Sequence, residues 1–137
     1  MKTALRTGTF ETNSSSVHSM VMCDDSEYID LVNNEAFLYG DEIISVKNYE
    51  IDMDNVDWDE VKNFYGNRNY RDWDWLKTSE KELWAKITAY CEREYWDGWM
   101  ANSFDSYLEQ FGDSFDRSYT AVGGIKVHAF GCYGYDG

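Results

Sequence analysis

The sequence contains no proline, few basic residues and no long hydrophobic run. Its 137 residues include 12 Lys and Arg against 26 Asp and Glu, which gives a formal net charge of −14. Surfaces that bind nucleic acids or anionic membranes are basic, so this balance argues against direct contact with either. No segment approaches the roughly 20 apolar residues of a membrane span. We therefore expect neither a nucleic-acid ligand nor a membrane.

Cysteines are also scarce. Cys23, Cys91 and Cys132 are scattered, odd in number and form no CxxC pair. Small secreted domains stapled by disulfides carry more cysteines in even numbers. The first residues also lack the apolar core of a secretory signal. These features predict a soluble cytoplasmic protein with reduced thiols.

Apolar and aromatic residues are abundant. Hydrophobic residues make up 43% of the chain and aromatic residues 18%, including six Trp. This content supports a packed core and argues against disorder. The length suits one domain, and no internal repeat or Pro/Gly-rich linker divides the chain. We expect residues 1–137 to form a single domain.

The hydrophobic patterns predict an α+β fold: a small, mainly antiparallel sheet with two to three helices. The longest helix is expected over about 80–97, opened by a capping box at Ser79 and Glu82. Shorter helices are expected over about 27–33 and 102–111. Strands are predicted at 17–23, 36–39, 43–46 and 125–130. Glu50, Asp52 and Asp54 alternate with apolar residues, which predicts a further strand with one wet face.

The middle of the chain is the most acidic part, and tryptophans are interleaved with its carboxylates. A net charge of −14 exceeds the magnitude of about 2–8 that suffices for solubility, and self-repulsion on this scale costs stability. Carboxylates bind arginine bidentately, and tryptophan is a frequent interface anchor. The candidate partner-binding residues are Glu50, Asp52, Asp54, Asp57, Trp58, Asp59, Glu60, Asp72, Trp73, Asp74 and Trp75.

This pattern predicts a surface that mimics a nucleic acid. A rigid fold that displays carboxylates at phosphate-like spacing can occupy the basic groove of a nucleic-acid-binding protein. A second acidic group, Glu92, Glu94 and Asp97, follows at the end of the long helix, where carboxylates oppose the helix dipole. Two alternatives stay open: a homodimer face and a plain solvated face.

Two short segments resemble a known family. The stretch from Arg6 to Ser19 reads RTGTFETNSSSVHS, and residues 129–136 read AFGCYGYD. The first resembles the opening of a family of small acidic phage and bacterial proteins that begin with an FETNSSS-x-HS phrase. The second is similar to the end of such proteins. The resemblance carries no activity or catalytic residue over.

The resemblance implies a mobile-element origin and a host-interaction role. With the acidic surface, it leads to the main functional prediction: a non-enzymatic phage-type inhibitor of a host nucleic-acid-processing or defence protein. Such an inhibitor would act in the host cytoplasm and needs no cofactor. A phage structural or assembly protein is a further alternative.

The segment from Arg6 to Ser19 supports a different class of function, a small enzyme or metal-binding protein. Its candidate residues are Arg6, Ser14, Ser15, Ser16 and His18. Ser16 and His18 would share one face of a strand, as a nucleophile and its base require. Runs of Asn and Ser also simply form turns and caps, and no nucleophile elbow is present.

The two histidines each precede a cysteine, and two His with two Cys make a tetrahedral zinc set. The set would be His18, Cys23, His128 and Cys132. These residues fall on the first and last predicted strands, which could be neighbours in the sheet. Neither spacing matches a zinc knuckle, and His18 and Cys23 would point to opposite faces of a strand. A weak Mg²⁺ or Ca²⁺ site among the Asp residues of 52–57 also stays open. The main prediction includes no metal.

Overall fold

The computed structural model describes residues 2–5, 16–69, 71–109 and 113–134. The elements in chain order are β1 (Lys2–Leu5), β2 (Ser16–Asp24), α1 (Asp25–Val32), β3 (Ala36–Tyr39), β4 (Glu42–Ser45), η1 (Met53–Asn55), α2 (Trp58–Gly66), η2 (Trp73–Trp75), α3 (Thr78–Glu94), η3 (Gly98–Met100), β5 (Ala101–Asn102), α4 (Phe104–Glu109), β6 (Ser114–Thr120) and β7 (Lys126–Gly134). Among these described residues, no helix is both long and apolar enough to cross a bilayer.

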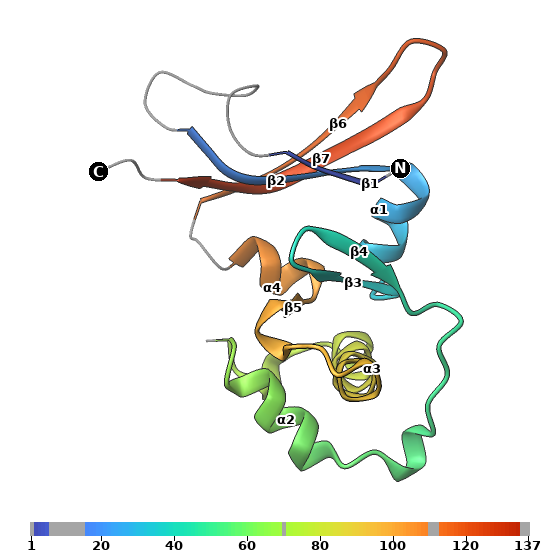
Figure 1. The fold of residues 1–137 in the computed structure, drawn as a ribbon, viewed down its shortest axis with the longest axis vertical. Helices are drawn as coiled ribbons and strands as arrows, with labels where there is room; N and C mark the ends of the chain where they lie inside the picture. The colour runs from blue at the N-terminus through green and yellow to red at the C-terminus, as the bar shows by residue number, and fades with distance from the viewer. Residues whose placement is uncertain (1, 6–15, 70, 110–112, 135–137) are drawn as a thin grey trace.

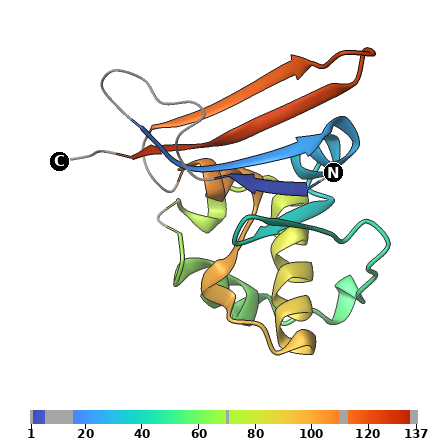
Figure 2. The ribbon, with the colours of Figure 1, turned by 45° about the horizontal axis from the view of Figure 1, so that its top comes forward.

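The strands form two antiparallel sheets, and the predicted α+β class is confirmed. One sheet has four strands in the order β1-β2-β7-β6, and the other has three in the order β4-β3-β5. The expected single sheet is thus divided, and the described residues form four α-helices where two to three were predicted. Strands β2 and β7 come from opposite ends of the chain and pair directly, with Val21 opposite Phe130. Figures 1 and 2 show them side by side in the larger sheet.

The elements stack in layers along the long axis of the molecule. Figure 1 shows the four-stranded sheet at one end, the three-stranded sheet below it, and α3 and α2 at the other end. On β3, Leu38 packs toward Val21 and Phe130 of the larger sheet. Its neighbour Phe37 packs into the cluster built by α2 and α3. Because both faces of β3 are covered, its sequence is an uninterrupted apolar run.

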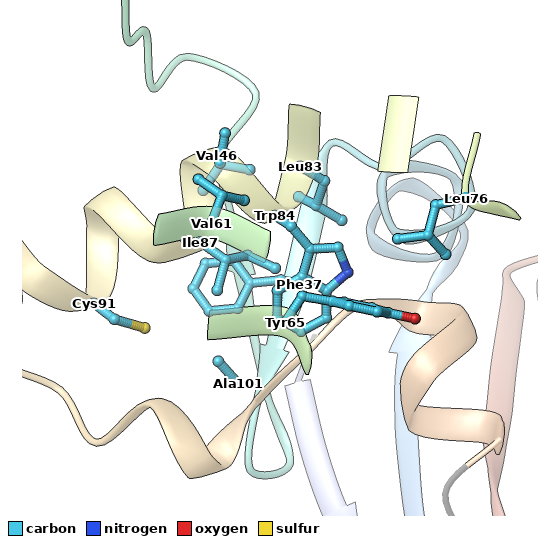
Figure 3. Packing of buried hydrophobic residues seen from close by; sticks show 11 residues of the cluster. Phe37, Val46, Val61, Tyr65, Leu76, Leu83, Trp84, Ile87, Cys91 and Ala101 are labelled. Carbon is cyan, nitrogen blue, oxygen red and sulfur yellow. The ribbon is translucent and has the colours of Figure 1, made fainter. Parts of the chain in front are cut away.

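The second core, between β3, α2 and α3, is built around aromatic rings (Figure 3). Trp84 of α3 is fully buried and meets Tyr65 of α2 edge to face, with ring centroids 5.2 Å apart. Leu83 and Ile87 lie beside Trp84 on α3, as the three- and four-residue spacing predicts. This cluster fixes α2 against α3 and so positions the acidic residues around α2.

The longest helix differs from its prediction at both ends. It begins at Thr78, and its N-cap is Lys77, which makes no side-chain capping bond. The predicted capping box at Ser79 and Glu82 is therefore wrong, because Ser79 lies inside the first turn. Its hydroxyl instead accepts a hydrogen bond of 3.0 Å from the Asn34 amide. The helix ends at Glu94, before the predicted residue 97, because Tyr95 adopts a left-handed conformation with φ 55°.

Helix α1 contains the capping box that the sequence analysis did not find. The Asp24 carboxylate accepts from the Glu27 backbone N–H at 2.8 Å, and the Glu27 carboxylate accepts from the Asp24 N–H at 3.3 Å. The Glu27 N–H lowers the pKa of the Asp24 carboxyl below its ordinary value. Such a reciprocal cap holds the sharp transition from β2 into α1.

We predict that Asp24→Ala lowers the free energy of unfolding by about 1 kcal/mol at neutral pH. Asp24→Asn should lower it less, because the amide oxygen still caps. The pKa of Asp24 is lowered on folding, so its ionised form contributes stability above the unfolded pKa of about 3.9. That contribution is lost as the pH falls through the folded pKa. Urea unfolding of the original protein and both variants from pH 7 to pH 2 tests this prediction. It is contradicted if the difference in free energy of unfolding between the original protein and Asp24→Asn does not change with pH.

Candidate acidic interface

The acidic segment before α2 is not a strand, which corrects the prediction for residues 50–54. The Asp52 carboxylate accepts from the Asp54 backbone N–H at 3.1 Å and so caps the short helix η1. The Asp72 carboxylate accepts from the Asp74 N–H at 3.0 Å and caps η2 in the same way. Aspartates favour such caps because their oxygens bond nearby backbone donors. The alternating acidic and apolar residues that predicted a strand thus belong to the capped start of a short helix.

Helix α2 begins in the same manner, and the sequence analysis did not predict it. The Asp57 carboxylate accepts from the Glu60 N–H at 3.2 Å. Asp59 and Glu60 lie in the first turn, where the helix dipole favours negative charge. Val61, the next residue, is buried. The helix therefore buries an apolar side chain next to carboxylates that stay exposed.

The structure brings the two predicted acidic segments together. The rings of Trp58 and Trp73 lie 6.4 Å apart between centroids, although 15 positions separate them in the chain. The Lys81 ammonium lies 5.7 Å from the Trp73 ring. Trp58 is 38% exposed and Trp75 is 80% exposed. We call the surface formed by Glu50, Asp52, Asp54, Asp57, Trp58, Asp59, Glu60, Asp72, Trp73, Asp74 and Trp75 the acidic interface.

Within the described residues, no Lys or Arg forms an ion pair with a carboxylate of the acidic interface. The ion pairs of Lys47, Arg71 and Arg93 go to carboxylates outside it. Every interface carboxylate is exposed. The described chain therefore gives these carboxylates no direct cationic partner, and solvent and salt screen their charge.

Arg71 anchors the η2 side of the interface. Its guanidinium donates to the Glu80 carboxylate at 2.6 Å and to Glu109 at 3.3 Å. Glu80 is only 3% exposed and also accepts from the Ser103 hydroxyl at 3.0 Å. Arg71 directly precedes Asp72, the N-cap of η2. The contacts of Arg71 with Glu80 and Glu109 therefore fix the position of η2 against the core.

The alternative site falls largely outside the described residues. Arg6, Ser14 and Ser15 are not among them, and for Ser16 and His18 only the backbone of β2 is described.

The zinc set does not converge. Strands β2 and β7 are neighbours, and Cys23 lies opposite His128. However, His128 and Cys132 stand four residues apart along β7, or about 13 Å at the rise of a strand. Zinc holds its ligands at about 2.0–2.3 Å. No group of three or more metal-ligating side chains occurs among the described residues.

His128 has other partners. Its Nε2 lies 2.7 Å from the Asp25 carboxylate, and its ring stacks on Tyr28 with centroids 3.8 Å apart. The Tyr28 hydroxyl in turn donates to Asp116 at 2.5 Å. Burial raises the pKa of this hydroxyl to about 12, and the bond to Asp116 acts in the same direction. These contacts tie α1 to the four-stranded sheet.

We predict that the cysteines react slowly in the folded protein. Burial raises the pKa of the Cys23 thiol to about 12 and that of Cys91 to about 11, and Cys132 is also buried. The thiolate is the reactive form, so little of it exists at pH 8. Ellman's reagent should label the native protein far more slowly than the urea-unfolded protein, in which all three thiols are accessible. A native thiol that reacts as fast as free cysteine would contradict the described burial.

Comparison of the chain with protein-family models, with curated proteins and with solved structures finds no match. The resemblance to phage and bacterial proteins therefore stays a prediction. The function has to be argued from the surface itself.

Proposed function

We propose that the protein is a non-enzymatic, phage-type inhibitor that binds the basic groove of a host nucleic-acid-processing or defence protein. The acidic interface would take the place of the nucleic acid. One observation carries this proposal: two acidic, tryptophan-containing segments meet at the contact of Trp58 with Trp73, and no described Lys or Arg neutralises their carboxylates.

The caps give this surface the order that mimicry needs. Asp52, Asp57 and Asp72 each use one carboxylate oxygen to accept a backbone N–H. A carboxylate has further lone pairs, so the same groups can still accept from a partner's arginine. A charge that is held in place before binding costs less conformational entropy on association. The capped turns thus support both the fold and the proposed display of charge.

The exposed tryptophans supply contact area beside the charge. Trp75 is 80% exposed, and Trp58 is 38% exposed. A large exposed apolar side chain rimmed by polar residues is typical of protein-binding sites. Tryptophan is also enriched among residues that dominate binding energy. Charge would bring the partner to this surface, and the tryptophans would strengthen the complex.

We predict that affinity capture from a bacterial lysate recovers a nucleic-acid-binding protein at low salt. Duplex DNA should displace this partner, and high salt should release it, because screening weakens contacts between exposed charges. Asp59→Lys, in the first turn of α2, should reduce recovery strongly. Mass spectrometry identifies the partner and measures its recovery.

Asp105→Lys is the matched control for this experiment. Asp105 is exposed and occupies the first turn of α4, so the change alters net charge and helix dipole as Asp59→Lys does. It lies outside the acidic interface and should leave recovery unchanged. Equal losses in both variants would show that only the net charge matters. Failure to recover any basic partner would contradict the proposal for that host.

A further inference from the structure

A groove runs beside the acidic interface, between the η1–α2 segment and α3. Its volume is about 250 Å³. The floor is mainly apolar and is formed by Ile51, Val56, Val61, Ala85 and Ala89. The carboxylate-bearing residues that line it are Asp52, Asp57, Glu60 and Glu92. Apolar and carboxylate-bearing side chains therefore line the same hollow.

Small side chains on α3 create the hollow. Ala85 and Ala89 are one turn apart and so lie on the same face of the helix, opposite Val61 of α2. The hydroxyl of Thr88, which also lines the groove, donates to the Trp84 carbonyl at 2.7 Å. Because this hydroxyl already has its partner, the floor requires no polar group from an occupant.

The electrostatics of the groove favour a cation. None of its four carboxylates forms an ion pair with a described Lys or Arg. Glu92 lies in the last turn of α3, where the helix dipole disfavours negative charge. The four like charges also repel one another. A positively charged group in the groove would relieve both unfavourable interactions.

The groove does not fit a metal ion. No three acidic, histidine or cysteine side chains of the described chain are arranged to hold one. An apolar floor beneath separated carboxylates instead suits a group with an aliphatic stem and a cationic head. The guanidinium group combines a fixed charge with several hydrogen-bond donors, which suits more than one carboxylate acceptor.

We propose that this groove binds an arginine side chain of the partner protein. The aliphatic stem would lie over Ala85 and Ala89, and the guanidinium would contact the carboxylates of Glu60 and Glu92. The inference rests on the proposed function, because the arginine would belong to the basic partner of the acidic interface. The groove would select an arginine side chain, whereas the rest of the acidic interface would bind positive charge in general.

The test uses N-acetyl-arginine amide as the probe, titrated into the isotope-labelled protein and followed by amide chemical shifts. Saturable shifts are expected at Val61, Ala85 and Ala89, and none with the neutral N-acetyl-norleucine amide. Ala89→Leu fills the groove without changing charge and should weaken the probe about tenfold or more. Ala121→Leu adds the same bulk at an exposed position and should leave binding unchanged.

A second variant separates binding from folding. Glu92→Gln removes a carboxylate from the last turn of α3, so it should raise the midpoint of thermal unfolding while weakening the probe. The proposal is overturned if Ala89→Leu binds the probe as well as the original protein does. It is equally overturned if shifts spread over all acidic surfaces, or if spermidine occupies the groove more tightly than the arginine probe.

This test and the capture experiment fail independently. If Asp59→Lys loses the partner but Ala89→Leu retains it, the acidic interface functions and the arginine groove does not. If the probe binds in the groove but no basic partner is captured, the groove is a real site and the proposed function is wrong.

Discussion

Replacing Arg71 with alanine should lower the free energy of unfolding by about 3–5 kcal/mol. The reason is Glu80, which is 3% exposed and whose carboxylate receives the Arg71 guanidinium at 2.6 Å. Without Arg71, the charge of Glu80 would stay buried with only neutral donors, such as Ser103. Urea unfolding at neutral pH measures the loss, and the denaturant dependence should be unchanged if only the folded state is affected.

Two comparisons isolate the buried pair. Arg93→Ala removes an arginine whose partner, Glu94, is exposed, so it should cost less than about 1 kcal/mol. Replacing Arg71 and Glu80 together with apolar residues should recover part of the loss, because no buried charge is left unpaired. If Arg71→Ala costs no more than Arg93→Ala, Glu80 is not held by Arg71 in solution.

Replacing Trp84 with alanine should lower the free energy of unfolding by about 3–5 kcal/mol. Trp84 is fully buried in the core between α2, α3 and β3, where its ring meets that of Tyr65 (Figure 3). The Phe64 ring also lies near it, with centroids 6.1 Å apart. Its removal leaves a cavity that these rigid rings cannot close. Thermal or urea unfolding measures the effect.

Trp75→Ala is the matched comparison, because it removes the same side chain from a site that is 80% exposed. It should change the free energy of unfolding by less than about 0.5 kcal/mol. It should instead weaken capture of the partner, since Trp75 belongs to the acidic interface. A loss of stability as large as that of Trp84→Ala would show that Trp75 is buried in solution.

Buried contacts hold the elements that carry the acidic interface. The Arg71–Glu80 pair and the Trp84 cluster hold η2 and α2 in place. The carboxylates of Asp52, Asp57 and Asp72 then cap the short helices that carry the exposed acids. Replacing one of these capping aspartates would therefore change both the stability of a helix and the charge of the surface. For this reason the capping aspartates are poor choices for testing partner binding alone. Asp54, Asp59 and Asp74 make no such cap and are the better choices.

The fold class and most strands are predictable from the sequence because they depend on local patterns. Strands β2, β3 and β4 begin and end within one residue of their predicted bounds, where apolar residues run together. Strand β7 begins within one residue of its prediction but continues to Gly134, beyond the predicted end at residue 130. Helix α3 was predicted from its apolar spacing, although its ends were not. The strand at 50–54 was wrong because alternation of acidic and apolar residues also fits a series of capped turns. An aspartate followed two or three residues later by another acid, as in Asp52–Asp54, was the available signal for such caps.

By itself, the sequence determined the charge of this protein, its α+β class and the residues able to form an acidic surface. Those properties depend on composition and on short-range periodicity, which need no knowledge of distant contacts. Only the tertiary structure decided that Trp58 meets Trp73, that Arg71 pairs with the buried Glu80, and that Ala85 and Ala89 line a groove with Val61. These contacts join segments far apart in the chain, and packing of α2 against α3 fixes them. No local pattern specifies that packing.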